Sequence, residues 1–199
     1  FLRGIACNFG NENPYNAVVE PNMRNLTITN CTFSDIHRDP ISVSHIGGNV
    51  LIQNNSLNGA RRGLLVDWYW SIDHQAWQPE NTCIRILDNN IIIDKTSPMI
   101  QCGLLFQQAT NVIVMNNKIS AKYGYGMVIE SKGAVIAGNS LIDCFKGMEI
   151  WGGLNGVVIE RNELTNITDF GIRLWGSCQR TIVSKNGLEM ASTSWAGII

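Results

Sequence analysis

One pattern of apolar and polar positions returns along almost the whole chain. An apolar residue, any residue and a second apolar residue are followed by two further positions, an asparagine, any residue and a last apolar residue. One copy reads Val50, Ile52, Asn55 and Leu57. Apolar residues at every second position predict a short β-strand on each side of the asparagine, with a bend between them. The anchor position is held by Cys31, Asn55, Asn89, Asn117, Asn139, Asn162 and Asn186, which are 24, 34, 28, 22, 23 and 24 residues apart.

A second phrase follows each anchor by 8 to 14 residues. It begins with a glycine and continues as apolar, any residue, apolar, which again predicts a strand. Each period therefore contains at least two alternating strands, a bend and a return of variable length. The phrase starts at Gly63, Gly103, Gly126, Gly147, Gly171 and Gly197, and at Pro40 in one further copy.

Strands this short cannot pair within one period of about 23 residues, so each must pair with the strand of the turn above or below it. The sequence therefore predicts an all-β parallel β-helix solenoid of about eight rungs of roughly 23 residues. Its inward positions stack as columns of Ile, Val and Leu, and its anchors stack as an amide ladder. The content of 25 Ile, 22 Asn and 19 Gly suits packed strands and tight corners. Leucine-rich repeats share the period, but their fixed leucine frame is absent.

We expect residues 1–199 to form a single segment of a longer chain, because the sequence begins at Phe1 and both ends fall within a coil. The longest insertion, predicted as a loop over residues 67–81, carries three of the six tryptophans. Long loops on a rigid scaffold are a usual place for function.

The Val-x-Ile-x-x-Asn-x-Ile turns and the asparagine ladder resemble the right-handed parallel β-helices of the pectin-lyase-like superfamily. That superfamily includes polysaccharide lyases, polygalacturonase-type hydrolases and phage tailspikes. The resemblance implies a right-handed coil and a polysaccharide as ligand, either bound or also cleaved. The Asn-Thr-Asp, Asp-Asp, Gly-His-Gly and Arg-Ile-Lys signatures of polygalacturonases are absent.

Strand alternation also predicts which side chains face outward. The residues two and four after each glycine point away from the core. Two tryptophans then stack one rung apart beside acidic and basic side chains, which is suitable for stacking on sugar rings. The alternative is that these tryptophans pack under another segment or subunit, and that the aromatic loop is a small core of its own. The candidate sugar-binding residues are Trp68, Trp70, Asp73, His74, Trp77, Gln107, Trp151, Arg173 and Trp175.

Cleavage of a glycosidic bond uses a pair of carboxylates, and Asp67, Glu130 and Glu149 are the catalytic candidates. Asp67 and Glu130 would stand two rungs apart, about 9.6 Å, with Gln107 between them, and Glu130 and Glu149 roughly 8 Å apart on a diagonal. The first spacing is near that of an inverting hydrolase. A lyase would instead need a base beside a cation, for which His74 or Arg173 could serve.

Composition excludes other classes. The net charge of −1 argues against nucleic acid, and no run of roughly 18 apolar residues predicts membrane insertion. The three histidines share no metal-ligand spacing and no Cys-x-x-Cys pair is present, so we expect no metal and no cofactor. The six cysteines are interpreted as reduced core thiols.

The outer face of the first strand carries an apolar stripe that Arg85 interrupts. Such a stripe favours a cover, either another part of the chain or an identical neighbour. The resemblance to tailspikes implies a homotrimer in which three rods run side by side. The stripe consists of Leu51, Ile113, Val135 and Val158.

Together these features predict a polysaccharide-binding β-helix located outside the cell or on a virion surface, with a leaning toward glycan cleavage as hydrolase or lyase. The alternative is a non-catalytic structural β-helix, such as a fibre shaft or surface adhesin, whose aromatic ridge is an assembly contact. The Trp-rich insertion favours polysaccharide binding, because a purely structural β-helix has no need of such a loop.

Overall fold

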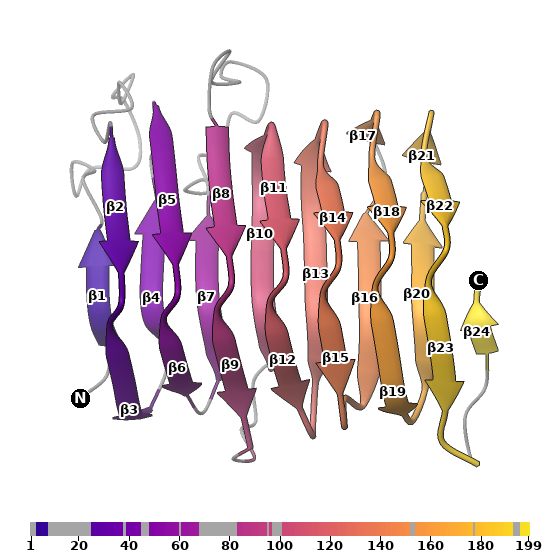
Figure 1. Cartoon of the computed structure of the whole chain (residues 1–199), viewed down its shortest axis with the longest axis horizontal. Coiled ribbons are helices and arrows are strands. Elements are labelled where there is room, and N and C mark those ends of the chain that lie inside the picture. The colour runs from indigo at the N-terminus through magenta and orange to yellow at the C-terminus, as the bar shows by residue number, and fades with distance from the viewer. Residues whose placement is uncertain are drawn as a thin grey trace, which may run out of the picture.

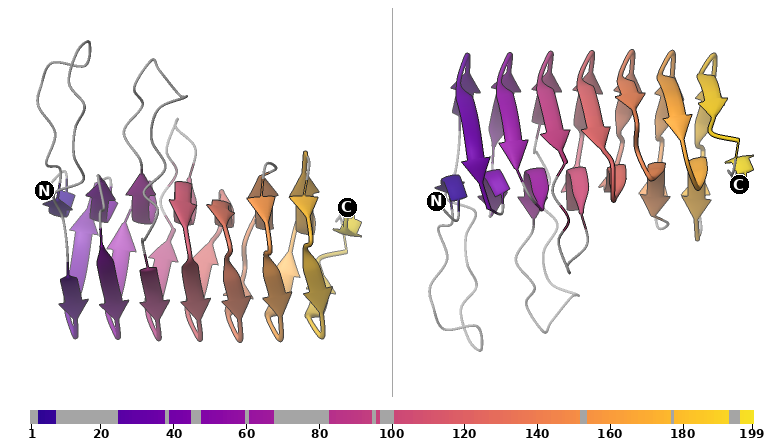
Figure 2. Two further views of the ribbon diagram at one scale, coloured as in Figure 1. Left: turned by 90° about the horizontal axis from the view of Figure 1, so that it is seen from above. Right: turned by 90° about the horizontal axis from the view of Figure 1, so that it is seen from below.

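The computed structural model describes residues 3–7, 25–37, 39–44, 48–59, 61–67, 83–94, 96, 101–151, 154–176, 178–192 and 196–199. Its strands form three parallel sheets that run side by side along one axis (Figure 1). Figure 2 views this stack from two further sides and shows successive turns following one another from the N-terminal to the C-terminal end.

Sheet A has eight strands in the order in which they follow along the chain. They are β1 (Arg3–Cys7), β4 (Asp39–Ser44), β7 (Arg62–Asp67), β10 (Cys102–Thr110), β13 (Tyr125–Lys132), β16 (Lys146–Trp151), β20 (Phe170–Trp175) and β24 (Ala196–Ile198).

Sheet B consists of the seven strands that precede each anchor. They are β2 (Leu26–Thr29), β5 (Asn49–Gln53), β8 (Cys83–Leu87), β11 (Val112–Met115), β14 (Val135–Ala137), β18 (Val158–Glu160) and β22 (Ile182–Ser184).

Sheet C consists of the seven strands that follow each anchor. They are β3 (Thr32–Ile36), β6 (Ser56–Gly59), β9 (Asn90–Ile93), β12 (Lys118–Ala121), β15 (Ser140–Ile142), β19 (Glu163–Ile167) and β23 (Gly187–Met190); a small separate pair joins β17 (Leu154–Asn155) and β21 (Cys178–Gln179).

The predicted parallel β-helix is confirmed, because every pair of neighbouring strands in these sheets is parallel and joins one turn to the next. The prediction of about eight rungs agrees with sheet A and exceeds sheets B and C by one strand each. Of the insertion predicted at 67–81, only Asp67, at the end of β7, belongs to the described residues.

The corner between sheets B and C is sharp because the residue before each anchor adopts a left-handed backbone conformation. Its φ angle lies between 53° and 63° in every copy. Asparagine, aspartate and glycine tolerate this region best, and they hold five of the seven corner positions. The seven corner residues are Asn30, Asn54, Asp88, Asn116, Gly138, Arg161 and Lys185.

The anchor asparagines form the predicted ladder inside this corner. The Nδ2 group of Asn117 donates to Oδ1 of Asn139 at 3.0 Å and to the carbonyl oxygen of Ile86 at 2.9 Å. Its own Oδ1 accepts from the backbone N–H and from Nδ2 of Asn89, both at 2.9 Å. The same bonds repeat from Asn55 to Asn186. Cys31, expected to be buried at the first anchor, is only half-buried, and its N–H donates to Asn55 Oδ1.

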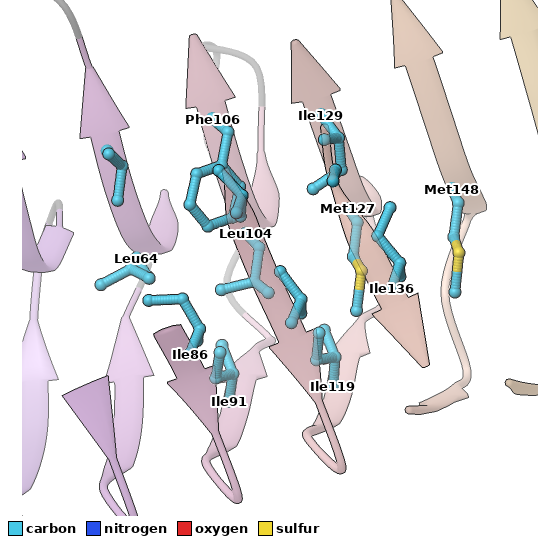
Figure 3. Packing of buried hydrophobic residues seen from close by; sticks show 14 of the residues in the cluster. Leu64, Ile86, Ile91, Leu104, Phe106, Ile119, Met127, Ile129, Ile136 and Met148 are labelled. Carbon is cyan, nitrogen blue, oxygen red and sulfur yellow. The ribbon is translucent and has the colours of Figure 1, made fainter. Parts of the chain in front are cut away.

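Between the three sheets lies one apolar core, which holds the inward residues of every turn. Figure 3 shows Leu104, Phe106 and Met127 of sheet A facing Ile86 of sheet B and Ile119 of sheet C. All five side chains are fully buried. From Gly63 to Gly147 the residues one and three after each glycine belong to this core, as the alternation predicts. In the last two strands, Ile172 belongs to the core and Leu174 packs against it, whereas Ile198 is exposed.

From Gly63 to Gly171, the glycine at the second position of each sheet A strand leaves no room for a Cβ atom against the core of sheet C. A Cβ atom at Gly147 would lie 2.1 Å from the carbonyl oxygen of Gly171 and 2.8 Å from Cδ2 of Leu164. The glycine column therefore allows sheet A to approach sheet C closely.

Replacing the central anchor in Asn117→Ala should lower the free energy of unfolding by about 3–5 kcal/mol, because it leaves several buried donors and acceptors without partners. Urea unfolding monitored by circular dichroism measures this loss. The control is Asn90→Ala, an exposed asparagine on β9, with an expected change within about 0.5 kcal/mol. Equal unfolding midpoints for the two variants would contradict a stabilising ladder.

In Gly147→Ala the added methyl group should force sheet A away from sheet C and cost about 1–3 kcal/mol of stability. The matched control is Gly156→Asn, because Gly156 has φ of 76° and no atom within 4 Å of its would-be Cβ, and asparagine tolerates that conformation. Thermal unfolding compares the two. Equal melting temperatures would show that the glycine column is not a packing requirement.

Candidate functional site

The outer face of sheet A gathers the predicted candidates that the structure describes. Ser42, Leu65, Leu105, Val128, Glu149 and Arg173 follow one another strand by strand at the second position after the glycine. At the fourth position Asp67 pairs with Gln107, and Trp151 pairs with Trp175. The guanidinium carbon of Arg173 lies 5.4 Å from the Trp175 ring centroid, so the two columns share a face.

Trp151 and Trp175 stand on adjacent strands at the C-terminal part of this face. Their exposed fractions are 44% and 58%, although tryptophan is usually largely buried. Adjacent strands are about 4.8 Å apart, so the two side chains form one ridge. We call these two residues the tryptophan ridge.

Beside the ridge, Arg173 is fixed by a carboxylate and by aromatic rings. Its Nε donates to Oε1 of Glu149 at 3.0 Å, and its Nη2 donates to the same oxygen. The guanidinium carbon lies 4.3 Å from the centroid of the Phe170 ring. Glu149 itself is only 3% exposed, so the ion pair between Arg173 and Glu149 is partly buried beside the tryptophan ridge.

A second cation on this face is surrounded by aromatic rings. The ammonium nitrogen of Lys146 lies 3.1 Å from the hydroxyl oxygen of Tyr125 and 3.8 Å from Oδ2 of Asp169. It also lies 4.6 Å from the centroid of the Tyr125 ring and 5.8 Å from those of Phe145 and Phe170. Tyr125 and Phe170 themselves meet edge to face at 6.3 Å.

Sequence reasoning missed Tyr125, Lys146 and Phe170, each of which directly precedes a glycine of the second phrase. Strict alternation would place them inward. The glycine itself takes an inward position, however, since a Cβ on Gly147 would meet Leu164, and the residue before it turns outward. The sequence feature that identifies these three residues is their repeated position directly before the glycine of the second phrase. At the N-terminal end, Arg62 holds the same place and binds buried Asp39 through Nε at 2.8 Å and Nη2 at 3.0 Å.

The catalytic candidates are only partly brought together. The register of β10 and β13 shifts between Phe106 and Ala109, where two residues, Gln107 and Gln108, face the single residue Glu130. This β-bulge interrupts the straight column that predicts a spacing of about 9.6 Å between Asp67 and Glu130. Of Asp67 the structure describes only the backbone, so the spacing of these carboxylates stays a prediction.

The candidates of the insertion lie outside the described residues. Their role in sugar binding therefore stays a prediction. They are Trp68, Trp70, Asp73, His74 and Trp77.

The apolar stripe is found on the outer face of sheet B in continuous register. Leu51, Arg85, Ile113, Val135 and Val158 pair in that order, and exposed Ile182 continues the stripe. Leu51, Ile113, Val135 and Val158 are half-buried, whereas Arg85 is exposed. Their predicted role as a contact between three copies of the chain stays a prediction.

The five cysteines whose side chains the structure describes are free thiols. Cys102 and Cys144 are fully buried, whereas Cys31, Cys83 and Cys178 are half-buried. Loss of hydration raises the pKa of Cys144 to about 12 and that of Cys102 still further. Within the described ranges, no three His, Cys, Asp or Glu side chains come together as a metal site. Those ranges also contain no helix able to span a membrane.

This architecture defines a parallel β-solenoid whose sheet A carries exposed tryptophans and paired charges on its outer face. The family described as the right-handed beta helix region matches residues 16–188, and the chain belongs to that family. The predicted right-handed coil is thereby confirmed, and the resemblance to the pectin-lyase-like superfamily is consistent with it. Comparison with curated proteins and with solved structures found no match. The fold supports a polysaccharide-related or a structural role.

The two buried thiols give a pH dependence with a definite sign. Their folded pKa values lie above the value of about 9 for an exposed thiol, so their contribution to stability is complete below pH 9. It is lost as the pH rises from about 9 toward 12, and the free energy of unfolding should fall over that range.

Alkylation by iodoacetamide at pH 8, followed by mass spectrometry, tests the same burial. Cys102 and Cys144 should stay unmodified until urea unfolds the protein, while Cys31, Cys83 and Cys178 react earlier. Rapid modification of Cys102 in the folded protein would contradict its position under the outer face of sheet A.

Proposed function

We propose that the chain binds a polysaccharide along the outer face of sheet A, with the tryptophan ridge as its stacking platform. The observation that carries this proposal is the exposure of Trp151 and Trp175, at 44% and 58%, on two adjacent strands in register. A ridge of flat aromatic side chains suits the apolar faces of successive sugar rings.

The neighbouring side chains supply what sugar hydroxyl groups need. Arg173 offers N–H donors beside Trp175. The half-buried residues Glu130, on the strand next to that of Trp151, and Gln107, one strand further away, add polar groups. Binding sites for small polar molecules combine an apolar surface with a few fixed polar groups. The rigid sheet holds these groups in place before the ligand arrives, which limits the entropy lost on binding.

Cleavage is a second candidate, supported by the β-bulge that places Glu130 at an irregular point of the face. Bulges are frequent beside active sites, where they redirect a side chain. In this scheme Glu130 and Asp67 are the acid and base. Glu149 is set apart from this pair, because its side chain is only 3% exposed and its Oε1 accepts two N–H groups of Arg173, which it holds in position.

The structural alternative makes a different use of the same face. In a fibre shaft or surface adhesin the tryptophan ridge would be covered by another chain. A ridge that binds sugar must instead be accessible in the isolated protein, and its removal must weaken binding without changing the state of association.

In Trp151→Ala and in Trp175→Ala the dissociation constant for the bound polysaccharide should rise about tenfold, because each variant removes a stacking ring. Affinity electrophoresis against a panel of neutral and acidic polysaccharides finds the ligand, and isothermal titration with an oligosaccharide of that ligand gives the constants. The control is Tyr123→Ala, which removes an equally exposed ring, at 45%, from the turn before β13.

Unchanged affinity in both tryptophan variants, or a change in oligomeric state alone, would contradict the proposal and favour the structural role. The same panel decides the second candidate. If the chain cleaves the bound polysaccharide, new chain ends appear and Glu130→Gln removes at least about 99% of the activity while binding persists. Binding without new chain ends leaves the protein a binding module.

A further inference from the structure

Three cations on the outer face of sheet A are already paired with carboxylates of the protein. Arg62 binds Asp39, Lys146 lies 3.8 Å from Asp169, and Arg173 donates twice to Glu149. Each of these three cations therefore has its own carboxylate. A cationic surface suited to an acidic polymer would instead leave its positive charges available.

The ion pair closest to the tryptophan ridge, between Arg173 and Glu149, is costly to separate. Glu149 is 3% exposed, and Arg173 is the cation that compensates its charge. If the carboxylate of an acidic sugar took Arg173, Glu149 would be left as a buried charge without its partner, which is strongly unfavourable.

A neutral sugar can bind without separating this ion pair. A guanidinium carries five N–H groups, and the two bonds to Glu149 leave others for donation beside the Trp175 ring, 5.4 Å away. The ion pair can thus stay closed while Arg173 donates to a hydroxyl group. Carboxylates such as that of Glu130 can accept from another hydroxyl.

We infer that the ligand of the tryptophan ridge is a neutral polysaccharide, whose sugars carry hydroxyl groups and no carboxylate or sulfate. The paired charges select against acidic polymers, and stacking and hydroxyl bonds supply the affinity. This inference rests on the proposed function, because it concerns the polymer that the same face binds.

The test compares binding of the full chain to neutral polymers, galactomannan and β-glucan, with binding to the acidic polymers polygalacturonate and alginate. At least one neutral polymer should bind about tenfold tighter than either acidic one. Raising the salt concentration should leave neutral binding nearly unchanged, because no exposed charge pair forms. Affinity electrophoresis at low and high salt measures both effects.

A substitution makes the test sharper. Glu149→Gln keeps the shape of the side chain but removes its charge, and so frees Arg173 for an external carboxylate. Affinity for polygalacturonate or alginate should rise about tenfold, while affinity for the neutral ligand changes less than about threefold. The matched control is Glu160→Gln, which neutralises a glutamate paired with Arg161 at the end of β18 in sheet B and should change neither.

The outcomes separate the two proposals. Tighter binding of an acidic polymer by the unaltered chain, weakened by salt and abolished in Arg173→Ala, would overturn the inference and leave the proposed function in place. This comparison does not depend on whether Glu149→Gln folds. Binding that does not require Trp151 or Trp175, or no binding to any polymer, would overturn the proposed function and the inference together.

Discussion

Each turn of this protein must stack on the next in a fixed register, and the buried asparagine ladder supplies that register. Every rung of the ladder joins an amide to the next amide and to the backbone of neighbouring turns, as Asn117 does with Asn89, Asn139 and Ile86. A slip of one residue would leave these groups unsatisfied in an apolar interior. The register carries over to sheet A, where it brings Trp151 beside Trp175 and Glu149 beside Arg173.

The stacking of turns also divides the side chains into inward ones, which stabilise the fold, and outward ones, which can bind a ligand. The inward positions of all three sheets are occupied by the core and the ladder, and the glycine column lets sheet A close on sheet C. Chemistry is therefore left to the outward positions, where side chains from successive turns meet although they are 21 to 24 residues apart in sequence. A repeated architecture thus builds an extended face suited to a polymer, with one strand for each step along it.

How much could be predicted depended on whether a residue obeys the repeat. The period of about 23 residues and the anchor column predict the coil and the ladder, and the alternation after each glycine predicts the exposure of Trp151 and Trp175. Lys146 could not be placed in this way, because the glycine beside it breaks the alternation. The bulge facing Glu130 was equally hidden, since one extra residue in β10 leaves no mark in the pattern. The ion pair between Glu149 and Arg173 depends on the directions of side chains on two neighbouring strands, which the spacing of residues in the sequence does not give.

A crystal structure of the chain with an oligosaccharide of the polymer it binds would show directly how the tryptophan ridge is used. We expect sugar rings stacked on Trp151 and Trp175, a hydroxyl group bonded to Arg173, and an intact ion pair between Arg173 and Glu149. An oligosaccharide on another face, or a tryptophan ridge covered by a second copy of the chain, would contradict this expectation.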